Sequence, residues 1–187
     1  MRNVLLYGLC GGLGDVYTLN TPGGKKTFTD EAEYKRLKQA VSDYDTAYGI
    51  ELSRYACEVG ADALLLVTPY YNKTSQAGLV AHYNYIADRV NKPIILYNVP
   101  SRTGVNLTPA SCKALSQHEN ISAIKEASGN ISYLQELHKL YGERYDIYTG
   151  NDDLTYLNLT LGGRGVISVV SNLVPRKMRE LCYDFVG

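Results

Sequence analysis

The sequence predicts an α/β fold of the TIM (β/α)8-barrel type, holding about five to six of the eight strands of a complete barrel. Short apolar runs alternate with amphipathic segments from residue 46 onward. The runs start roughly 20–30 residues apart, the length of one βα unit. Repeated βα units build either a doubly wound sheet or a barrel. No G-x-G-x-x-G motif follows an apolar run, which favours the barrel.

The first 45 residues depart from this alternation. We expect Val4–Leu9 to form a strand that runs into a glycine-rich turn, and Thr21–Lys26 to form an exposed turn or loop. Thr29–Val41 is typical of a capped, highly charged helix, and a second helix is predicted over Thr46–Val59. Residues 1–187 are therefore interpreted as a single partial barrel domain, with a divergent part over 1–45.

The remaining elements alternate between strands and helices. Five runs are too short for helices and rich in branched or aromatic residues, so they are predicted to be buried parallel strands: Ala63–Thr68, Pro93–Asn98, Ile121–Lys125, Asp146–Thr149 and Gly165–Val170. Helices are expected at Ser75–Val90, Thr108–His118, Ile131–Tyr141, Asp153–Leu161 and Pro175–Val186. Ser75 and Thr108 are candidate caps, and Pro109 suits the first turn of its helix.

Composition excludes several classes of function. Nineteen basic residues balance nineteen acidic ones, so no global field favours nucleic acid or an anionic membrane. The longest apolar runs are too short to span a bilayer, and residues 1–10 lack the pattern of a secretory signal. Four widely spaced cysteines without a CxxC pair indicate free thiols and a reducing cytoplasm. We therefore expect no nucleic-acid partner and no membrane partner.

The histidines give no sign of a metal site. His82, His118 and His138 lie within predicted helices and do not share a ligand spacing. Asp152 and Asp153 alone cannot enclose a metal ion. We therefore expect no metal requirement.

Polar residues gather where the predicted strands end. In a βα barrel the catalytic groups lie at the C-terminal ends of the strands. These ends carry a concentration of polar groups unusual for apolar strands: Thr68–Asn72, Tyr97–Arg102, Lys125–Ala127, Gly150–Asp153 and Ser168. The sequence thus predicts a reactive site at this edge of the sheet.

Lys125 is the candidate nucleophile because it closes an apolar strand, where an ammonium group is poorly solvated. Burial favours the neutral amine and lowers the pKa of a lysine below its usual value of about 10.4. A neutral amine is the form that adds to a carbonyl group. The alternative interpretation is that Lys125 forms an ion pair with an acid such as Asp152.

Long motifs at characteristic spacings make residues 46–182 resemble the dihydrodipicolinate synthase family: VTPYYNK, IILYNVPSRTG, AIKEASGN, TGNDD and GGRGVISVVSN. The resemblance implies a Schiff-base lyase that condenses pyruvate with aspartate semialdehyde to give 4-hydroxy-tetrahydrodipicolinate, in lysine and diaminopimelate biosynthesis. It also implies a cytoplasmic homo-oligomer without a cofactor, because pyruvate itself is bound covalently.

The resemblance assigns roles to individual residues. By the match to IKEASG, Lys125 would be the Schiff-base lysine, and by the match to LYNVP, Tyr97 would move protons at the substrate carbonyl. Arg102, in PSRTG, would hold the carboxylate of the semialdehyde; the alternative is an ordinary loop salt bridge. Tyr71 would reach across a dimer interface into the neighbouring active site. Tyr70 would lie at that interface, at a position associated with lysine feedback.

Three further positions come from the same resemblance. Ile167, in GVIS, would face the reacting centre with its backbone carbonyl. Gly12 and Leu13 stand where the family has two threonines, one holding the pyruvate carboxylate and one in a proton relay. Backbone N–H groups of the glycine-rich turn could still receive the carboxylate, but the hydroxyl relay is lost. Gly150 and the residues after it are expected to serve structure more than chemistry.

Departures from the family pattern leave two alternatives open. The resemblance leads us to expect a further βα unit before residue 1 and a helical region after residue 187. A chain with these departures could be a non-catalytic remnant or a keto-acid-binding pseudoenzyme. It could also be another pyruvate-dependent aldolase that uses a different aldehyde. Lys125, Tyr97 and Arg102 favour the enzyme, whereas Leu13 favours the remnant.

Overall fold

The structure is a computed structural model that describes residues 17–21, 24–28, 46–70, 73–141 and 144–186. Five parallel strands form one sheet in the order β3-β4-β5-β6-β7. Their bounds are β3 (Leu64–Val67), β4 (Ile94–Asn98), β5 (Ile121–Glu126), β6 (Asp146–Thr149) and β7 (Gly165–Val166). Sequence order equals spatial order, as in a barrel, so the predicted fold class is confirmed as a partial barrel.

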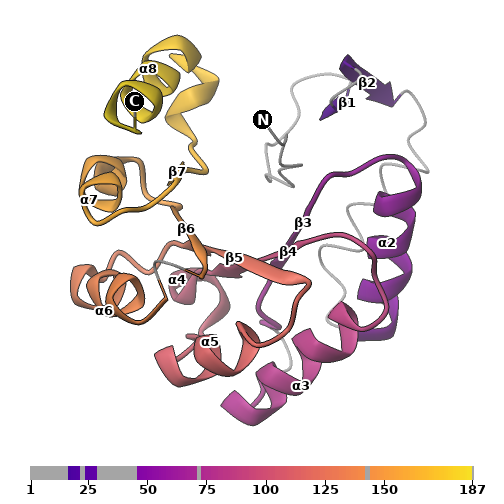
Figure 1. The fold of residues 1–187 in the computed structure, drawn as a ribbon. Helices are drawn as coiled ribbons and strands as arrows, with labels where there is room; N and C mark the ends of the chain where they lie inside the picture. Colours follow the sequence, from indigo (N-terminus) through magenta and orange to yellow (C-terminus); the bar gives the residue numbers. More distant parts are fainter. Residues whose placement is uncertain (1–16, 22–23, 29–45, 71–72, 142–143, 187) are drawn as a thin grey trace.

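The helices follow one another around the outside of the sheet, from α2 to α8 (Figure 1). They are α2 (Thr46–Glu58), α3 (Gln76–Ala87), α4 (Pro100–Thr103), α5 (Pro109–Leu115), α6 (Ile131–Tyr141), α7 (Thr155–Thr160) and α8 (Pro175–Val186). Both predicted caps are confirmed: Ser75 Oγ accepts from the N–H of Gly78 at 3.1 Å, and Thr108 Oγ1 accepts from the N–H of Ser111 at 3.2 Å. The four-residue helix α4 was not predicted.

The last predicted strand, Gly165–Val170, is wrong beyond Val166. A 3-10 turn, η2 (Val170–Asn172), follows instead. The carboxylate of Asp152 accepts hydrogen bonds from the N–H groups of Val169 and Val170, at 3.1 and 3.2 Å. These N–H groups therefore donate to the Asp152 side chain rather than to a neighbouring strand. Similarly, the helix expected over Asp153–Leu161 begins as a 3-10 turn, η1 (Asp152–Leu154), before α7.

The expectation of an exposed turn or loop over Thr21–Lys26 is wrong for Thr21 and for Gly24–Lys26, which belong to strands. An antiparallel hairpin joins β1 (Tyr17–Thr21) to β2 (Gly24–Phe28), with Thr21 opposite Gly24. A two-residue connection allows the ladder to continue to its last pair, so most of the predicted loop belongs to strands. The predicted strand Val4–Leu9 and the predicted helix Thr29–Val41 lie outside the described residues.

The sheet buries side chains on both faces. On the outer face, against the helices, lies a large apolar cluster that includes Tyr83, Leu96, Ile124, Leu134 and Ile147. The inner face carries a smaller cluster with Tyr97 and Tyr148 packed against it: Ala63, Leu65, Ile95, Ala123 and Ile167. Because strand side chains alternate between faces, Tyr97, Lys125 and Tyr148 belong to the inner face. Within the described part of the chain, no helix is long and apolar enough to cross a membrane.

Candidate active site

Lys125 stands in a row of side chains that crosses the inner face near the C-terminal ends of the strands. Val67 is in register with Tyr97, Tyr97 with Lys125, and Lys125 with Tyr148. Parallel pairing therefore brings the lysine between two tyrosines from neighbouring strands. Lys125 Nζ lies 4.1 Å from the centroid of the Tyr97 ring. This arrangement brings together the predicted nucleophile and the predicted proton-transfer group.

The surroundings of Lys125 favour its neutral form. Burial lowers its pKa, the positive charge of Arg102 lowers it further, and the negative charge of Asp152 opposes both. Lys125 does not pair with Asp152: among the described residues the ion pairs are His118–Asp88 and Arg164–Asp146. The Asp152 carboxylate instead accepts from Ser168 Oγ and from two backbone N–H groups. Within the described part of the chain, the alternative ion pair between Lys125 and Asp152 is therefore not formed, and the role of Lys125 as nucleophile stays a prediction.

Gly150 shapes the space around the Lys125 side chain. A Cβ atom at position 150 would lie 2.8 Å from Lys125 Cε and 2.7 Å from Ala127 Cβ. Both distances are closer than carbon atoms approach without displacement. A residue expected to serve structure thus limits where the reactive amine can lie. This contact joins β5 to the segment after β6, so the TGNDD motif alone could not reveal it.

Tyr97 and Arg102 approach the site from one βα segment. Burial raises the pKa of the Tyr97 phenol, while the Arg102 charge lowers it. Arg102 lies on α4 directly after β4, and Gly104 ends this helix in the left-handed conformation with φ of 63°. The Arg102 side chain is exposed, and among the described residues it has no ion-pair partner. Its charge acts on both inner-face groups, and it forms no loop salt bridge within the described part of the chain.

The other predicted site residues divide into two groups. Ile167 is buried directly after β7, and its N–H donates to the carbonyl of Thr149 at 2.9 Å. Tyr70 is half-buried beyond the end of β3. Tyr71, Gly12 and Leu13 lie outside the described residues, so their predicted roles stay predictions.

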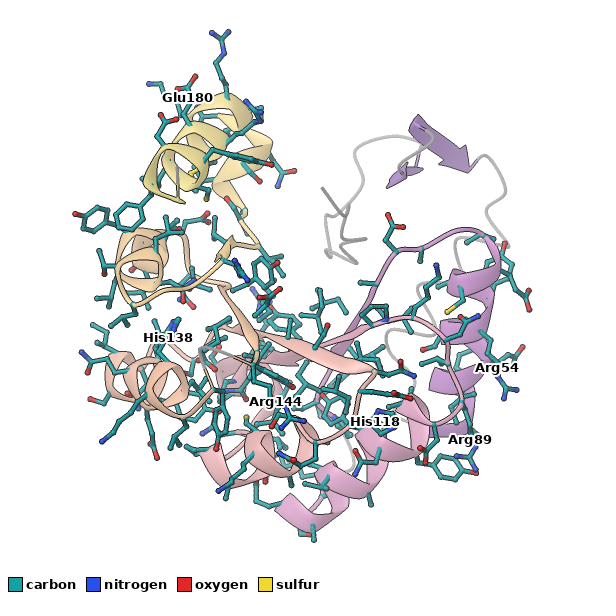
Figure 2. The ribbon with its side chains drawn as sticks, in the orientation of Figure 1. Arg54, Arg89, His118, His138, Arg144 and Glu180 are labelled. Atoms are coloured by element: carbon teal, nitrogen blue, oxygen red, sulfur yellow. The ribbon has the colours of Figure 1, made fainter. Side chains whose placement is uncertain are left out.

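The histidines are distributed among separate contacts. His82 Nδ1 lies 2.8 Å from Thr46 Oγ1, His118 pairs with Asp88, and His138 Nε2 lies 2.9 Å from Asn158 Oδ1. Figure 2 shows His118 and His138 in different parts of the helix layer. Among the described residues, no group of three or more His, Cys, Asp or Glu side chains could hold a metal ion.

Glu126 and Asn98 are functional candidates that sequence reasoning missed. Both are buried polar residues at strand ends, at 3% and 0% exposure, on the outer face directly behind Lys125 and Tyr97. Asn98 Nδ2 donates to Glu126 Oε2 at 2.7 Å. Their adjacency to the two reactive residues in the sequence was the available signal.

Residues 39–186 match the Dihydrodipicolinate synthetase family. The chain belongs to this family. It is 47% identical over 181 residues to a 4-hydroxy-tetrahydrodipicolinate synthase of Clostridium perfringens strain ATCC 13124, with 95% of this chain and 62% of that protein covered. Identity to 4-hydroxy-tetrahydrodipicolinate synthase 1 of Clostridium acetobutylicum is 43%, with the same coverage. The chain thus spans about three fifths of the length of these curated relatives.

Solved structures of the family have the same fold. The dihydrodipicolinate synthase of Thermotoga maritima aligns with a TM-score of 0.75 at 36% identity, over 84% of this chain and 59% of that chain. The enzyme of Aquifex aeolicus aligns with a TM-score of 0.74 at 41% identity, over 76% and 49%. A dihydrodipicolinate synthase of Acinetobacter baumannii, described as complexed with pyruvate, gives 0.74 at 42% identity, over 76% and 49%.

Proposed function

We propose that this chain is a Schiff-base lyase of the 4-hydroxy-tetrahydrodipicolinate synthase type, which condenses pyruvate with aspartate semialdehyde. The observation that carries the proposal is the half-buried Lys125 amine, held over the Tyr97 ring on the inner face. Membership of the family supports the choice of reaction.

The lowered pKa of Lys125 supports its role as nucleophile. The neutral amine adds to the C2 carbonyl of pyruvate, and loss of water gives the Schiff base. Loss of a proton from C3 gives an enamine, and C3 then bonds to the aldehyde carbon of the second substrate. The amino group that comes from the semialdehyde then adds to the C2 imine carbon, and departure of the Lys125 amine closes the ring and releases 4-hydroxy-tetrahydrodipicolinate. Each step needs a proton donor or acceptor beside Lys125, and Tyr97 is the adjacent candidate.

Tyr97 and Arg102 serve the two substrates differently. The Tyr97 phenol transfers protons at the carbonyl oxygen, since a hydroxyl of raised pKa is protonated at neutral pH and can donate. The planar Arg102 guanidinium holds the semialdehyde carboxylate, because two parallel N–H groups suit two carboxylate oxygens. Its exposed position on α4 leaves it accessible to a substrate.

The remaining assignments rest on the family motifs. Ile167 presents its backbone carbonyl to the reacting centre, and Tyr71 completes the active site of a neighbouring copy, with Tyr70 at the same interface. The backbone at Gly12 and Leu13 receives the pyruvate carboxylate. The active form is therefore a homo-oligomer. It needs no cofactor, because the covalent lysine adduct itself stabilises the carbanion. The free thiols of Cys57, Cys112 and Cys182 support a cytoplasmic location.

Reductive trapping tests the proposal directly. The protein is incubated with pyruvate and borohydride, and its intact mass is measured before peptide mapping. One adduct on Lys125 is expected. Lys125→Ala should abolish it, whereas Lys139→Ala, at an exposed position on α6, should leave it intact. Absence of an adduct on folded protein, or an adduct that survives Lys125→Ala, contradicts the proposal.

A keto-acid-binding pseudoenzyme is the second candidate, and Leu13 favours it. The family position carries a hydroxyl in the proton relay, and loss of a general acid–base group costs about 10²–10⁴-fold in rate. Under this candidate the adduct forms, but condensation with aspartate semialdehyde is absent. Leu13→Thr should then raise condensation without changing adduct formation. Turnover with an aldehyde that lacks a carboxylate would instead indicate another pyruvate-dependent aldolase.

A further inference from the structure

A second row of side chains lies directly behind the reactive row. Thr68, Asn98, Glu126 and Thr149 occupy the strand ends on the outer face, and each is at most 3% exposed. Asn98 is in register with Glu126, and Glu126 with Thr149. Each residue of this buried polar row directly follows a residue of the inner row in the sequence. Movement of one row therefore moves the other.

Glu126 and Asn98 form the centre of the buried polar row. Glu126 Oε2 accepts from Asn98 Nδ2 at 2.7 Å, and Glu126 Oε1 accepts from the N–H of Ser128 at 2.5 Å. Asn98 Nδ2 also donates to Asn106 Oδ1 at 2.8 Å, and Asn98 Oδ1 accepts from the N–H of Leu107 at 3.0 Å. Both hydrogens and the oxygen of the Asn98 amide are thus used, which fixes its orientation.

The same residues join three strand ends through the backbone. The N–H of Ala127 donates to the carbonyl of Asn98 at 2.9 Å, and the N–H of Gly150 donates to the carbonyl of Glu126 at 2.6 Å. Gly150 in turn limits the position of the Lys125 side chain. Two sets of contacts therefore run from Glu126 toward the reactive amine. The carboxyl is bonded to Asn98, which directly follows Tyr97, and the backbone carbonyl is bonded to Gly150.

Joining two strands through a buried carboxyl costs free energy of desolvation. Burial of a carboxyl without compensation costs several kcal/mol, and apolar residues of similar size often fill such a place at no loss of stability. What the carboxyl adds is direction: two donors from different segments must meet its two oxygens at fixed angles. Orientation matters most beside a reacting group, where misplacement of about 1 Å can cost 10²-fold in rate.

We propose that Glu126 is a positioning residue for Lys125. Its carboxyl, through Asn98 and Ser128, locks the ends of β4 and β5 so that the amine stays over the Tyr97 ring and partly shielded from water. The consequence for catalysis rests on the proposed Schiff-base function. The positioning itself is a property of the amine and is measurable without substrate.

Competitive acetylation with trace acetic anhydride across pH measures the neutral fraction of each lysine after peptide mapping. Among the described residues, the charges of Arg102 and Asp152 act on Lys125, and the titratable Tyr97 and Tyr148 flank it on the neighbouring strands. The variants leave all four residues in place. In Glu126→Gln, one of the two donors meets an amide N–H instead of an oxygen. Lys125 should then be more hydrated, and the pH midpoint of its acetylation should rise toward the usual value of about 10.4. The exposed Lys113 and Lys139 serve as internal references.

Matched variants separate positioning from general damage. Glu119→Gln makes the same substitution at an exposed position just before β5, and it should leave the midpoint unchanged. Asn106→Ala, also exposed, removes only the second acceptor of Asn98 and should raise the midpoint by less. Glu126→Gln combined with Asn98→Asp reverses the polarity of the central hydrogen bond and should restore the original midpoint. If Glu126→Gln does not fold, the acetylation midpoint of Lys125 in Asn106→Ala still tests the proposal.

The pyruvate reaction gives a second, separate readout. At a fixed pH near neutrality, trapping should slow about tenfold for each unit by which the pKa of Lys125 rises, and pyruvate should slow acetylation of Lys125 in the unchanged protein. If Glu126→Gln folds and the acetylation midpoint of its Lys125 equals that in Glu119→Gln, the positioning role of Glu126 is refuted. A shifted midpoint in a protein that never forms a pyruvate adduct supports positioning while refuting the proposed function.

Discussion

At the scale of single residues, electrostatics and close contact act on the same amine. Arg102 lowers the pKa values of both Lys125 and Tyr97, although it lies on a separate helix. Gly150 acts by having no side chain at all. Replacing these two residues should have different effects, because Arg102 contributes a charge and Gly150 leaves space for the Lys125 side chain.

Replacement of Arg102 by Ala should harm semialdehyde use more than Schiff-base formation. The lost hydrogen bonds to a carboxylate are worth about 1.5–3 kcal/mol in the second step. Loss of the charge also raises the pKa of Lys125, which slows the first step to a smaller extent. Arg102→Lys keeps the charge and should restore the first step only. Steady-state kinetics and trapping rates decide the matter, and equal damage to both steps would indicate a structural role for α4.

Gly150→Ala should reduce pyruvate trapping by at least tenfold. The new Cβ would lie 2.8 Å from Lys125 Cε and 2.7 Å from Ala127 Cβ, so the Lys125 side chain must shift and is expected to leave its place over the Tyr97 ring. Gly49→Ala is the matched control, because its Cβ would meet only Ile86 Cδ1 at 3.9 Å. Within helix α2 that control should stabilise the fold by about 0.5–1 kcal/mol. Equal trapping rates in the two variants would show that Gly150 does not constrain the lysine.

Sequence patterns could predict Lys125 and Tyr97 because an apolar strand that ends in a polar group is visible in one segment. The contact between Gly150 and Lys125 joins two segments, so neither segment reveals it alone. Glu126 is a similar case: a charged residue at a strand end reads as solvent-exposed until its partners, Asn98 and Ser128, are known. Glu126 and Asn98, whose hydrogen bond crosses from one strand to the next, were therefore missed, and the contact of Gly150 with Lys125 could not be foreseen.

At the scale of elements, Asn158 joins three parts of the fold. Its Nδ2 donates to the carbonyls of Ile147 on β6 and Gly165 on β7, at 3.1 and 2.9 Å. Its Oδ1 faces His138 Nε2, on the side of α6 that lies toward α7 (Figure 2). Since Asn158 Oδ1 can only accept, His138 Nε2 carries the hydrogen. His138 Nδ1 is then buried without a partner in the described structure.

This contact predicts a loss of stability in acid. Burial lowers the pKa of His138 below its usual 6.5, although the hydrogen bond to Asn158 opposes the shift. The unfolded chain therefore binds a proton more readily than the folded one. The contribution of His138 is complete above about pH 6.5 and declines as pH falls through the folded pKa. Urea midpoints between pH 5 and 8 should fall less steeply in His138→Gln, which keeps a donor toward Asn158, and parallel curves would exclude His138 as the cause.

Element boundaries show where periodicity is a poor guide. Strands β3 to β6 and helices α3 and α6 follow the predicted runs closely, because burial and alternation decide them. Strand β7 has only two residues, although the apolar run continues to Val170. The Asp152 carboxylate takes the N–H groups of that run. A side chain from another segment overrode the local pattern, as it did at none of the other predicted strands that the structure describes.

At the scale of the whole molecule, the five-stranded sheet has two edges. Among the described residues, β3 and β7 each pair on one side only, and unpaired strand edges template association with other chains. Near β7, large apolar side chains are exposed: Val169 and Leu173, on either side of η2, at 71% and 84%, and Tyr156 on α7 at 62%. An open edge and an apolar surface therefore lie at the same end of the fold.

The last prediction is that the isolated 187-residue chain is not a concentration-independent monomer. Clustered apolar surface favours association, because burying it between two chains contributes about 25 cal/mol of favourable free energy per Å² of apolar area removed from water. Leu173→Lys should reduce association by placing a charge on the most exposed apolar position of this surface. Leu140→Lys makes the same change on α6, away from the edge, and should have little effect. Light scattering across a concentration series measures both, and a sharp monomer mass for the unchanged chain at every concentration would refute the argument from edge and surface together.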